Sequence, residues 1–400
     1  MLNQGLDRVR LSLRGSLRRP RQSHTGAITT ATRYKENLMI SRRAQSIDAS
    51  GIRKVFDLGA TLSDPINLSI GQPDFDALDV IKESAKRAID TRKSGYTVTQ
   101  GILMLRMKLR EKFGLTDESG KDVFITCGVS GGLMLGYMAM LDPGDEILLP
   151  DPYFCLYRDL ALMLNAVPKY YDTYPTFGLS AERIEREITP KTRAILVMNP
   201  GNPTGYAAVE RELNDVVALA KRKNIWLIYD EIYSAFSYDH AHVSCLGKYE
   251  NTLVVNGFAK SHGIPGWRIG YAIGPNELIQ NMLKIQQFSF VCAPSIVQWA
   301  LVDGIDVDLS KKVAEYKEKR DFIYQALSSK FSVEKPTGAF YIFPEAPGGS
   351  GEAFVEKCVA NNLLVIPGSV FSRRDSHFRI SFAASMETLS RGAEVLNKLA

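Results

Sequence analysis

The sequence predicts an α/β fold, in which a large three-layer domain is built around a mostly parallel seven-stranded sheet and a smaller α/β unit follows. Seven short apolar runs lie between residues 123 and 273, and helix-forming segments separate several of them. The runs lack alternation of apolar and polar residues, so we expect strands that are buried on both faces. Beyond residue 308, a highly charged stretch carries apolar residues at helical spacing, which indicates a second unit.

The expected elements follow in chain order. The strands are VFIT (123–126), EILL (146–149), AVPKYY (166–171), AILV (194–197), IWLIY (225–229), LVV (253–255) and IGYAI (269–273). Helices are expected at 133–141, 158–164 and 209–221, and DPGD at 142–145 has turn chemistry. The later amphipathic helix is marked by Leu309, Val313, Tyr316, Ile323 and Leu327.

Length and composition place the chain among globular proteins. Its 400 residues are enough for about two or three folded units. Hydrophobic residues make up 45% and charged residues 23%, unlike disordered, fibrous or disulfide-stapled chains. No stretch approaches the roughly 18 to 20 apolar residues of a membrane-spanning helix, so we predict no membrane association.

The positive charge is concentrated in an N-terminal arm. Residues 1–43 contain ten basic and two acidic residues, which leaves 39 basic against 42 acidic in the rest of the chain. The folded part therefore does not have the charge of a nucleic-acid binder, and we predict none as partner. We expect the arm to be disordered or mis-assigned, with Met39 as the real start, or to be a cleaved transit peptide.

The cysteine pattern argues against disulfides and metal sites. The five cysteines are scattered, with no CxxC and no Cys/His cluster. We therefore predict no metal site and a reducing compartment. The cytoplasm is expected, or an organelle matrix if the arm is a transit peptide.

Chemically useful residues follow several of the expected strands, where open parallel sheets bind ligands. CGVSGG (127–132) after the first strand can present backbone N–H groups to a phosphate at a helix start. NPGNPTG (199–205) fixes Asn202 on a rigid loop, and Asp230 and Tyr233 follow another strand. Lys260 follows the LVV strand, and Arg268 precedes the last one.

These groups together suit pyridoxal 5'-phosphate. This cofactor needs a lysine amine for its aldehyde, a carboxylate for its ring nitrogen and N–H groups or cations for its phosphate. The ring also needs an aromatic neighbour, and Phe154 in PDPYFCLY (150–157) follows the EILL strand. A nicotinamide-binding turn is the alternative for CGVSGG, but the segment departs from GxGxxG and would leave Lys260 and Asp230 unexplained.

The ordered motifs NPGNPTG, YDEIY (229–233) and AKSHGIPGWRIGY (259–271) resemble those of fold type I aminotransferases, the aspartate aminotransferase superfamily of classes I and II. The likeness runs from about residue 66 to residue 385. It implies a small domain of residues 44–77 and 310–400, a large cofactor-binding domain of residues 78–309, and a homodimer. It also implies a ping-pong transamination through a Lys260 aldimine, from an L-amino acid to a 2-oxo acid such as 2-oxoglutarate.

The resemblance also implies a role for each site residue. Lys260, Asp230 and Tyr233 would be catalytic, and Gly71, Asn202 and Arg379 would bind substrate. The cofactor would be held by Lys260, Val129, Ser130, Phe154, Asn202, Asp230, Tyr233, Arg268 and, from the other subunit, Tyr96.

The sequence departs from the family pattern in two places. Many relatives carry a phosphate-binding serine three residues before the lysine, where this chain has Gly257. The aspartate-specific branch has an arginine in the segment that here reads KIQQFSFVCAPS (284–295), with Phe288 and Phe290 instead. We therefore expect neutral or aromatic amino acids, or a broad range that includes aspartate. A β-eliminating lyase of the same fold, which would share the cofactor residues, remains the alternative.

Overall fold

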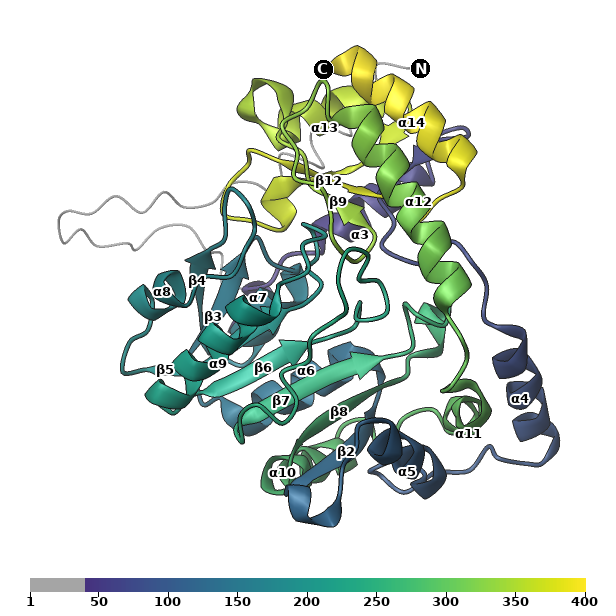
Figure 1. Ribbon diagram of the computed structural model, residues 1–400, viewed down its shortest axis with the longest axis vertical. Coiled ribbons are helices and arrows are strands. Elements are labelled where there is room, and N and C mark those ends of the chain that lie inside the picture. Colours follow the sequence, from purple (N-terminus) through teal and green to yellow (C-terminus); the bar gives the residue numbers. More distant parts are fainter. Residues whose placement is uncertain (1–39) are drawn as a thin grey trace.

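The computed structural model describes residues 40–400, which are drawn as coloured ribbon in Figure 1. Most of the predicted arm, residues 1–39, lies outside the described residues, and predictions about it stay predictions. The described chain begins with two short helices, α2 (Arg42–Gln45) and α3 (Gly51–Gly59).

A seven-stranded sheet forms the centre of the larger part, as predicted (Figure 1). Its strands lie in the order β2-β8-β7-β6-β5-β3-β4, and only β8 runs against the others. Each of the seven predicted runs falls on one of them. The bounds are β2 (Lys121–Thr126), β3 (Glu146–Asp151), β4 (Val167–Asp172), β5 (Thr192–Met198), β6 (Trp226–Asp230), β7 (Thr252–Gly257) and β8 (Gly270–Pro275).

Two separate cores on the two faces of this sheet make the three layers. Phe124 belongs to one core, whereas its neighbours Val123 and Ile125 belong to the other, as expected for a strand buried on both faces. The first core includes side chains of α6 (Gly128–Met140), α7 (Cys155–Met163) and α10 (Asn276–Gln287). The second includes those of α4 (Asp79–Asp90), α5 (Leu103–Lys112), α8 (Ala181–Arg186), α9 (Glu210–Lys223) and α11 (Ser295–Gly304).

A third core lies under the C-terminal helices at the top of Figure 1. Here β1 (Ile66–Asn67) pairs with β10 (Leu363–Leu364), so the N-terminal segment joins the C-terminal part of the chain. A three-stranded antiparallel sheet contains β11 (Ile366–Pro367), β12 (Phe378–Ser381) and β9 (Tyr341–Ile342). The helices are α12 (Ser310–Leu327), at the position predicted for the long amphipathic helix, α13 (Gly351–Ala360) and α14 (Met386–Leu399). The domain boundaries at 44–77, 78–309 and 310–400 stay predictions.

The reversed direction of β8 brings its start to the edge where the other strands end. Gly270, the first residue of β8, lies opposite both Thr126 at the end of β2 and Gly257 at the end of β7. Arg268 precedes β8 by two residues and therefore reaches the same edge as Lys260, which follows β7. The site residues are gathered at this edge.

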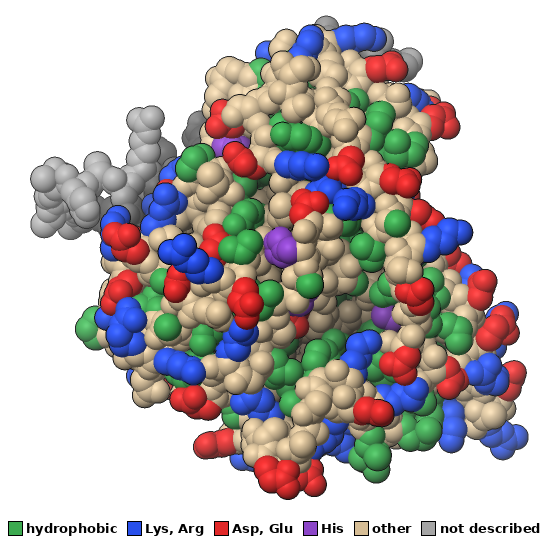
Figure 2. Space-filling model, viewed as in Figure 1, with side chains coloured by type: hydrophobic (Ala, Val, Ile, Leu, Met, Phe, Trp, Pro, Cys, Tyr) green, Lys and Arg blue, Asp and Glu red, His purple; other side chains and the backbone are tan. Residues whose placement is uncertain are grey.

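The surface of the described residues has two further features. Figure 2 shows Lys and Arg side chains interspersed with Asp and Glu, without one large patch of a single sign on the face in view. No helix within residues 40–400 is both long and apolar enough to cross a membrane.

Candidate active site

The predicted site residues gather around one cavity of about 620 Å³ at the carboxyl edge of the large sheet. Ten of the eleven line it, and Tyr96 is the exception. The ten are Gly71, Val129, Ser130, Phe154, Asn202, Asp230, Tyr233, Lys260, Arg268 and Arg379. Residues from both ends of the chain, such as Gly71 and Arg379, thus meet residues of the large sheet.

Lys260 lies on the segment that joins β7 to β8. Its Nζ donates a hydrogen bond to the carbonyl oxygen of Gly71 at 2.6 Å. Burial, together with the positive charges of Arg379 and Arg268, lowers the pKa of Lys260 to about 8. At pH 7 a much larger fraction of this amine is neutral than of an ordinary lysine, so it is suited to act as a nucleophile and base.

This shift in pKa predicts how Lys260 reacts in the cofactor-free protein. Only the neutral amine is acetylated, so we expect labelling of Lys260 by acetic anhydride to rise with pH and level off near the pKa of about 8. Ordinary lysines have a pKa of about 10.4 and should still gain reactivity above that point. Peptide mass spectrometry over a pH series, with exposed lysines as internal reference, tests this. A profile for Lys260 that parallels the exposed lysines would contradict the prediction.

Asp230 ends β6 and is buried. One carboxylate oxygen accepts a hydrogen bond from the Tyr157 hydroxyl at 2.9 Å, and the other accepts from the backbone N–H of Ile232 at 3.0 Å. Burial raises the pKa of Asp230 to about 6, although both hydrogen bonds favour its charged form. A cation placed against this carboxylate would stabilise its charge, which is what a protonated ring nitrogen offers.

The phosphate-binding residues that the sequence predicted lie together at the start of α6. Gly128 has φ of +70°, and a Cβ there would come within 2.7 Å of Nη2 of Arg268. A Cβ on Gly270 would come within 2.9 Å of the backbone nitrogen of Val129. These glycines therefore allow the Arg268 guanidinium and the start of β8 to pack against the N-terminus of a helix, where anions bind favourably.

The same packing leaves little room for a side chain at Gly257, where the sequence departs from the family pattern. A Cβ on Gly257 would lie 3.0 Å from the Cα of Gly270 and 3.1 Å from the carbonyl oxygen of Ile269. Because these contacts are with backbone atoms, a serine at 257 would require β7 and β8 to shift apart. Anion binding at this edge would depend on Ser130, Arg268 and the helix start instead.

Arg379 lies on β12, and its side chain is fully buried between the rings of Tyr341 and Phe371, at 4.5 Å from each centroid. It donates to Oδ1 of Asn202 at 3.0 Å and to the carbonyl oxygen of Ser69 at 2.8 Å. Its Nε has no hydrogen-bond partner in the described part of the chain, and burial lowers its pKa. A buried guanidinium with a spare donor on a cavity is suited to bind a carboxylate.

The aromatic residues of the cavity support one another. The hydroxyl of Tyr233 lies 2.7 Å from that of Tyr341, and burial raises the pKa of Tyr233. Phe154 directly precedes α7 and meets the ring of Tyr157 edge to face at 5.7 Å. Sequence reasoning missed Tyr341 and Tyr157. Tyr157 could have been found, because it lies about one helical turn after Phe154.

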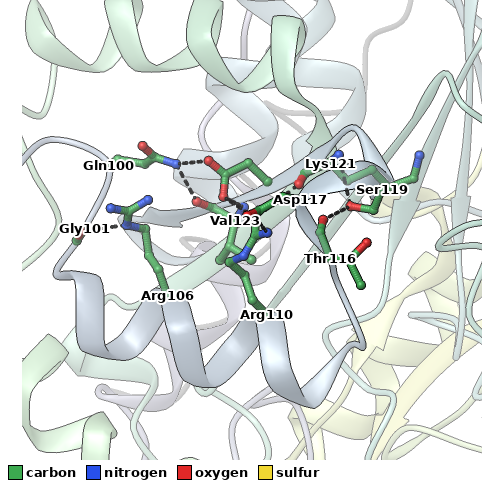
Figure 3. A network of polar contacts seen from close by, with 10 residues as sticks. Gln100, Gly101, Arg106, Arg110, Thr116, Asp117, Ser119, Lys121 and Val123 are labelled. Atoms are coloured by element: carbon green, nitrogen blue, oxygen red, sulfur yellow. Dashed lines mark hydrogen bonds and ion pairs between the residues drawn. The ribbon is translucent and has the colours of Figure 1, made fainter.

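Tyr96 lies on the loop between α4 and α5, and 88% of its side chain is exposed. Two hydrogen bonds of the buried Gln298 hold this loop. Its Oε1 accepts from the backbone N–H of Ile102 at 2.8 Å, and its Nε2 donates to Oγ1 of Thr97 at 3.0 Å. Gln100 anchors the loop on β2 by donating to Oδ2 of Asp122 at 2.7 Å. It also donates to the carbonyl oxygen of Val123 at 2.9 Å (Figure 3). The loop is thus well supported, while its tyrosine is exposed and does not line the chain's own cavity.

Phe288 and Phe290, on which the expected substrate preference partly rested, do not line the cavity of their own chain. Both follow α10, and their exposed fractions are 92% and 38%. Gln286, just before them, donates to the carbonyl oxygen of Thr99 at 2.7 Å, which places this segment beside the Tyr96 loop. Neither phenylalanine can shape this cavity within one chain.

Sequence reasoning also missed Arg53. This residue lies on α3 and lines the cavity together with its neighbours Ser50 and Ile52. Nothing in the local sequence marks it, because the N-terminal segment reaches the site only through the folding of the whole chain.

Comparison with known proteins gives a consistent result. The family described as "Aminotransferase class I and II" matches residues 63–396. A probable aspartate aminotransferase of Methanocaldococcus jannaschii is 36% identical over 90% of this chain and 100% of its own length. An aromatic-amino-acid aminotransferase of Thermococcus litoralis is 31% identical over 90% of this chain and 98% of its own length. The solved structure of Thermus thermophilus aspartate aminotransferase with maleate matches with a TM-score of 0.85 and 31% identity, over 90% of this chain and 99% of that one.

Proposed function

Because this chain belongs to the class I and II aminotransferases and is a transaminase, we propose that it moves the amino group of an L-amino acid to 2-oxoglutarate by a ping-pong mechanism with pyridoxal 5'-phosphate. The resemblance drawn from the sequence is thereby confirmed. For the donor we propose neutral and aromatic amino acids within a broad range that includes aspartate. The observation that carries the proposal is the gathering of Lys260, Asp230 and Arg379 around one cavity.

The residues around the cavity fit the cofactor. The start of α6 with Val129, Ser130 and Arg268 would hold its phosphate, and Asp230 would hold its ring nitrogen. Asn202 and Tyr233 would bind its phenolic oxygen, and Phe154 would pack on the ring. When bound, the cofactor supplies an electron sink for the charge that develops at the substrate's Cα.

The protein's own groups would carry out positioning and proton transfer. Arg379 would bind the α-carboxylate of the substrate through the donor that is now unpartnered, with help from the backbone of Gly71. This contact would orient the Cα–H bond, and the Lys260 amine would take that proton as general base. The protonated Lys260 amine would then hold that proton in the cavity and could release it again as general acid.

An absorption spectrum of the purified protein with pyridoxal 5'-phosphate tests the proposal. We expect a band of the lysine-bound cofactor that converts to the pyridoxamine form when a single amino acid is added without an acceptor. Adding 2-oxoglutarate should reverse the change. Release of pyruvate and ammonia with the first band restored would support the β-eliminating lyase instead, and no lysine-bound band at all would refute the cofactor assignment.

We propose a homodimer in which Tyr96 completes the phosphate site of the neighbouring subunit. Exposed apolar side chains lie on the Tyr96 loop, on α5 and in the segment after α10, which supports an interface in this region. They are Val98, Leu103, Met104, Met107, Phe288, Phe290 and Val291. In a dimer of this kind, Phe288 and Phe290 would face the partner's substrate rather than their own chain's cavity.

Subunit mixing tests this arrangement. Tyr96→Ala and Lys260→Ala proteins should each be strongly impaired, but heterodimers formed by unfolding and refolding a mixture would contain one site with both groups intact. With random pairing we expect about a quarter of wild-type activity. Each variant refolded alone is the control. If the mixture is no more active than the two controls combined, Tyr96 does not act across the interface.

For the compartment we propose the cytoplasm, or an organelle matrix if residues 1–43 act as a transit peptide. All five cysteines lie within residues 40–400 and are free thiols there. Free thiols persist in reducing compartments, which supports either location.

A further inference from the structure

We propose that Tyr341 is a positioning residue: its hydroxyl donates a hydrogen bond to the hydroxyl of Tyr233 and so strengthens and directs the donation of Tyr233 to the cofactor's phenolic oxygen. This inference rests on the proposed function, because it assumes that Tyr233 contacts that oxygen. It gives a role to a tyrosine on the cavity wall that belongs to none of the motifs named above.

The two hydroxyls form a buried pair on the cavity. Their oxygens are 2.7 Å apart, and both side chains are buried and line the cavity. A phenol has one proton to donate and can also accept. If the proton of Tyr233 goes to the cofactor, the short contact persists as a hydrogen bond only when Tyr341 donates to Tyr233. An accepted hydrogen bond also polarises the O–H group of Tyr233, which makes it a stronger donor.

Packing holds both hydroxyls in place. The ring of Tyr233 meets the rings of Phe340 and Tyr341 nearly at right angles, with centroids 5.1 and 5.6 Å apart. The hydroxyl of Tyr341 lies close against Gly71, where a Cβ would come within 2.6 Å of its oxygen. The Tyr341 hydroxyl is therefore confined between the backbone of Gly71 and the hydroxyl of Tyr233.

The surrounding charges favour donation from Tyr341. Burial raises the pKa of both phenols, and the positive charge of Arg379 opposes that rise in both. The negative charge of Asp230, in contrast, raises the pKa of Tyr233 further. Since the more acidic phenol of a pair is the better donor, the proton in the contact belongs to Tyr341.

Tyr341 also supports the arginine proposed to bind the substrate. On the small sheet, Tyr341 pairs with Ser381, two residues from Arg379, so the side chains of Tyr341 and Arg379 share a face. The guanidinium of Arg379 lies 4.5 Å from the centroid of the Tyr341 ring. Tyr341→Phe keeps this ring and removes only the hydroxyl, so it separates the contact with Tyr233 from the support of Arg379.

A pH titration of the lysine-bound band tests the proposal without turnover. The band changes with pH because the proton between the cofactor's phenolic oxygen and the lysine nitrogen is lost as the pH rises. Donation from Tyr233 withdraws charge from this oxygen and lowers the midpoint. Tyr341→Phe should therefore raise the midpoint by about half a pH unit, the size of effect expected when one neutral hydrogen bond of a chain is lost.

Tyr171→Phe is the matched control. It also removes a buried phenol hydroxyl, one that donates to the carbonyl oxygen of Leu196 at 2.9 Å, but Tyr171 does not line this cavity. The control should leave the midpoint at its wild-type value.

A double-mutant cycle distinguishes positioning of Tyr233 from a general effect on the cavity. Tyr233→Phe should raise the midpoint more than Tyr341→Phe does, and adding Tyr341→Phe to it should cause no further shift. In the cofactor-free protein, thermal unfolding gives a second readout. The two substitutions together should cost less stability than the sum of their separate costs, because they remove the same hydrogen bond.

The outcomes separate this inference from the proposed function. A wild-type midpoint in Tyr341→Phe, or an equal shift with and without the Tyr233 hydroxyl, would overturn the role of Tyr341. Additive costs in thermal unfolding would overturn the hydrogen bond on which that role rests. If the wild-type protein gives no lysine-bound band, the proposed function itself fails and this role with it, a result unlike the others because in them the wild-type band is present and titrates.

Discussion

Replacing Lys260 by alanine is expected to abolish turnover, with a loss of about 10² to 10⁴-fold from the missing general base and a further loss from the missing nucleophilic amine. Lys260 lines the cavity. Among the charged groups that shift the pKa of Lys260, Asp230 is the carboxylate, and it raises that pKa. No other lysine among the described residues lines this cavity. The variant therefore lacks a primary amine that could take its place. Steady-state assays with several donors and 2-oxoglutarate measure the loss.

The variant should still fold. Burial lowers the pKa of Lys260, so the charged amine is favoured in the unfolded chain, and its contribution to stability falls as the pH drops through about 8. At pH 7 its removal should not reduce the stability of the cofactor-free protein. Lys284→Ala, which removes an exposed lysine bonded to Asn281, is the control for handling and purification. Multiple turnovers by Lys260→Ala, with wild-type contamination excluded by mass spectrometry, would contradict the assigned role.

The central sheet could be predicted because its signal is local. Each of its strands is a short apolar run, and burial on both faces follows from the lack of alternation within a run. The direction of β8 could not be predicted in this way, because IGYAI has the same composition whether it runs parallel or antiparallel. Only pairing with β2 and β7 sets its direction.

The candidate site was predictable where its residues follow strands. Asp230 directly follows one buried run and Lys260 lies shortly after another, and the topology of a parallel sheet brings such positions to one edge. Arg268 reached the same edge for a different reason, because it precedes the one reversed strand. Arg53 and Tyr341 come from the unit built around β9–β12, whose position against the large sheet depends on long-range packing and leaves no local pattern.

The Tyr96 loop shows a further limit of sequence reasoning. Its support by Gln298 and Gln286 joins segments 201 and 187 residues apart in the sequence, and neither glutamine stands in a recognisable motif. A buried glutamine that bonds backbone groups on both sides can be identified only after the chain has folded. The same holds for the hydrogen bond from Tyr157 to Asp230, which crosses from α7 to β6.

Replacing Asp230 by alanine should leave the protein able to bind the cofactor and slow the chemical step by about 10² to 10³-fold, the usual cost of losing one preorganised charge. The proposed phosphate-binding groups at the start of α6 and Lys260 itself are untouched by this change. A cofactor ring whose nitrogen has lost its anionic partner is a weaker electron sink. Single-turnover conversion of the bound cofactor by a saturating amino acid measures the effect.

Proton exchange at the substrate's Cα tests the role of Asp230 more directly. In the proposed mechanism, Asp230 stabilises charge that develops only once the Cα proton has left. Exchange of that proton with deuterium from solvent, followed by NMR, should therefore slow by the same factor as the half-reaction. Asp230→Asn keeps the side-chain shape but not the charge, and it should be impaired to a similar extent. Asp306→Ala, which removes an exposed carboxylate paired with Lys108, is the control. If Asp230→Asn exchanges the proton at the wild-type rate, the charge at this position does not support the reaction, and the carboxylate serves only to hold Tyr157 and the backbone of Ile232 in place.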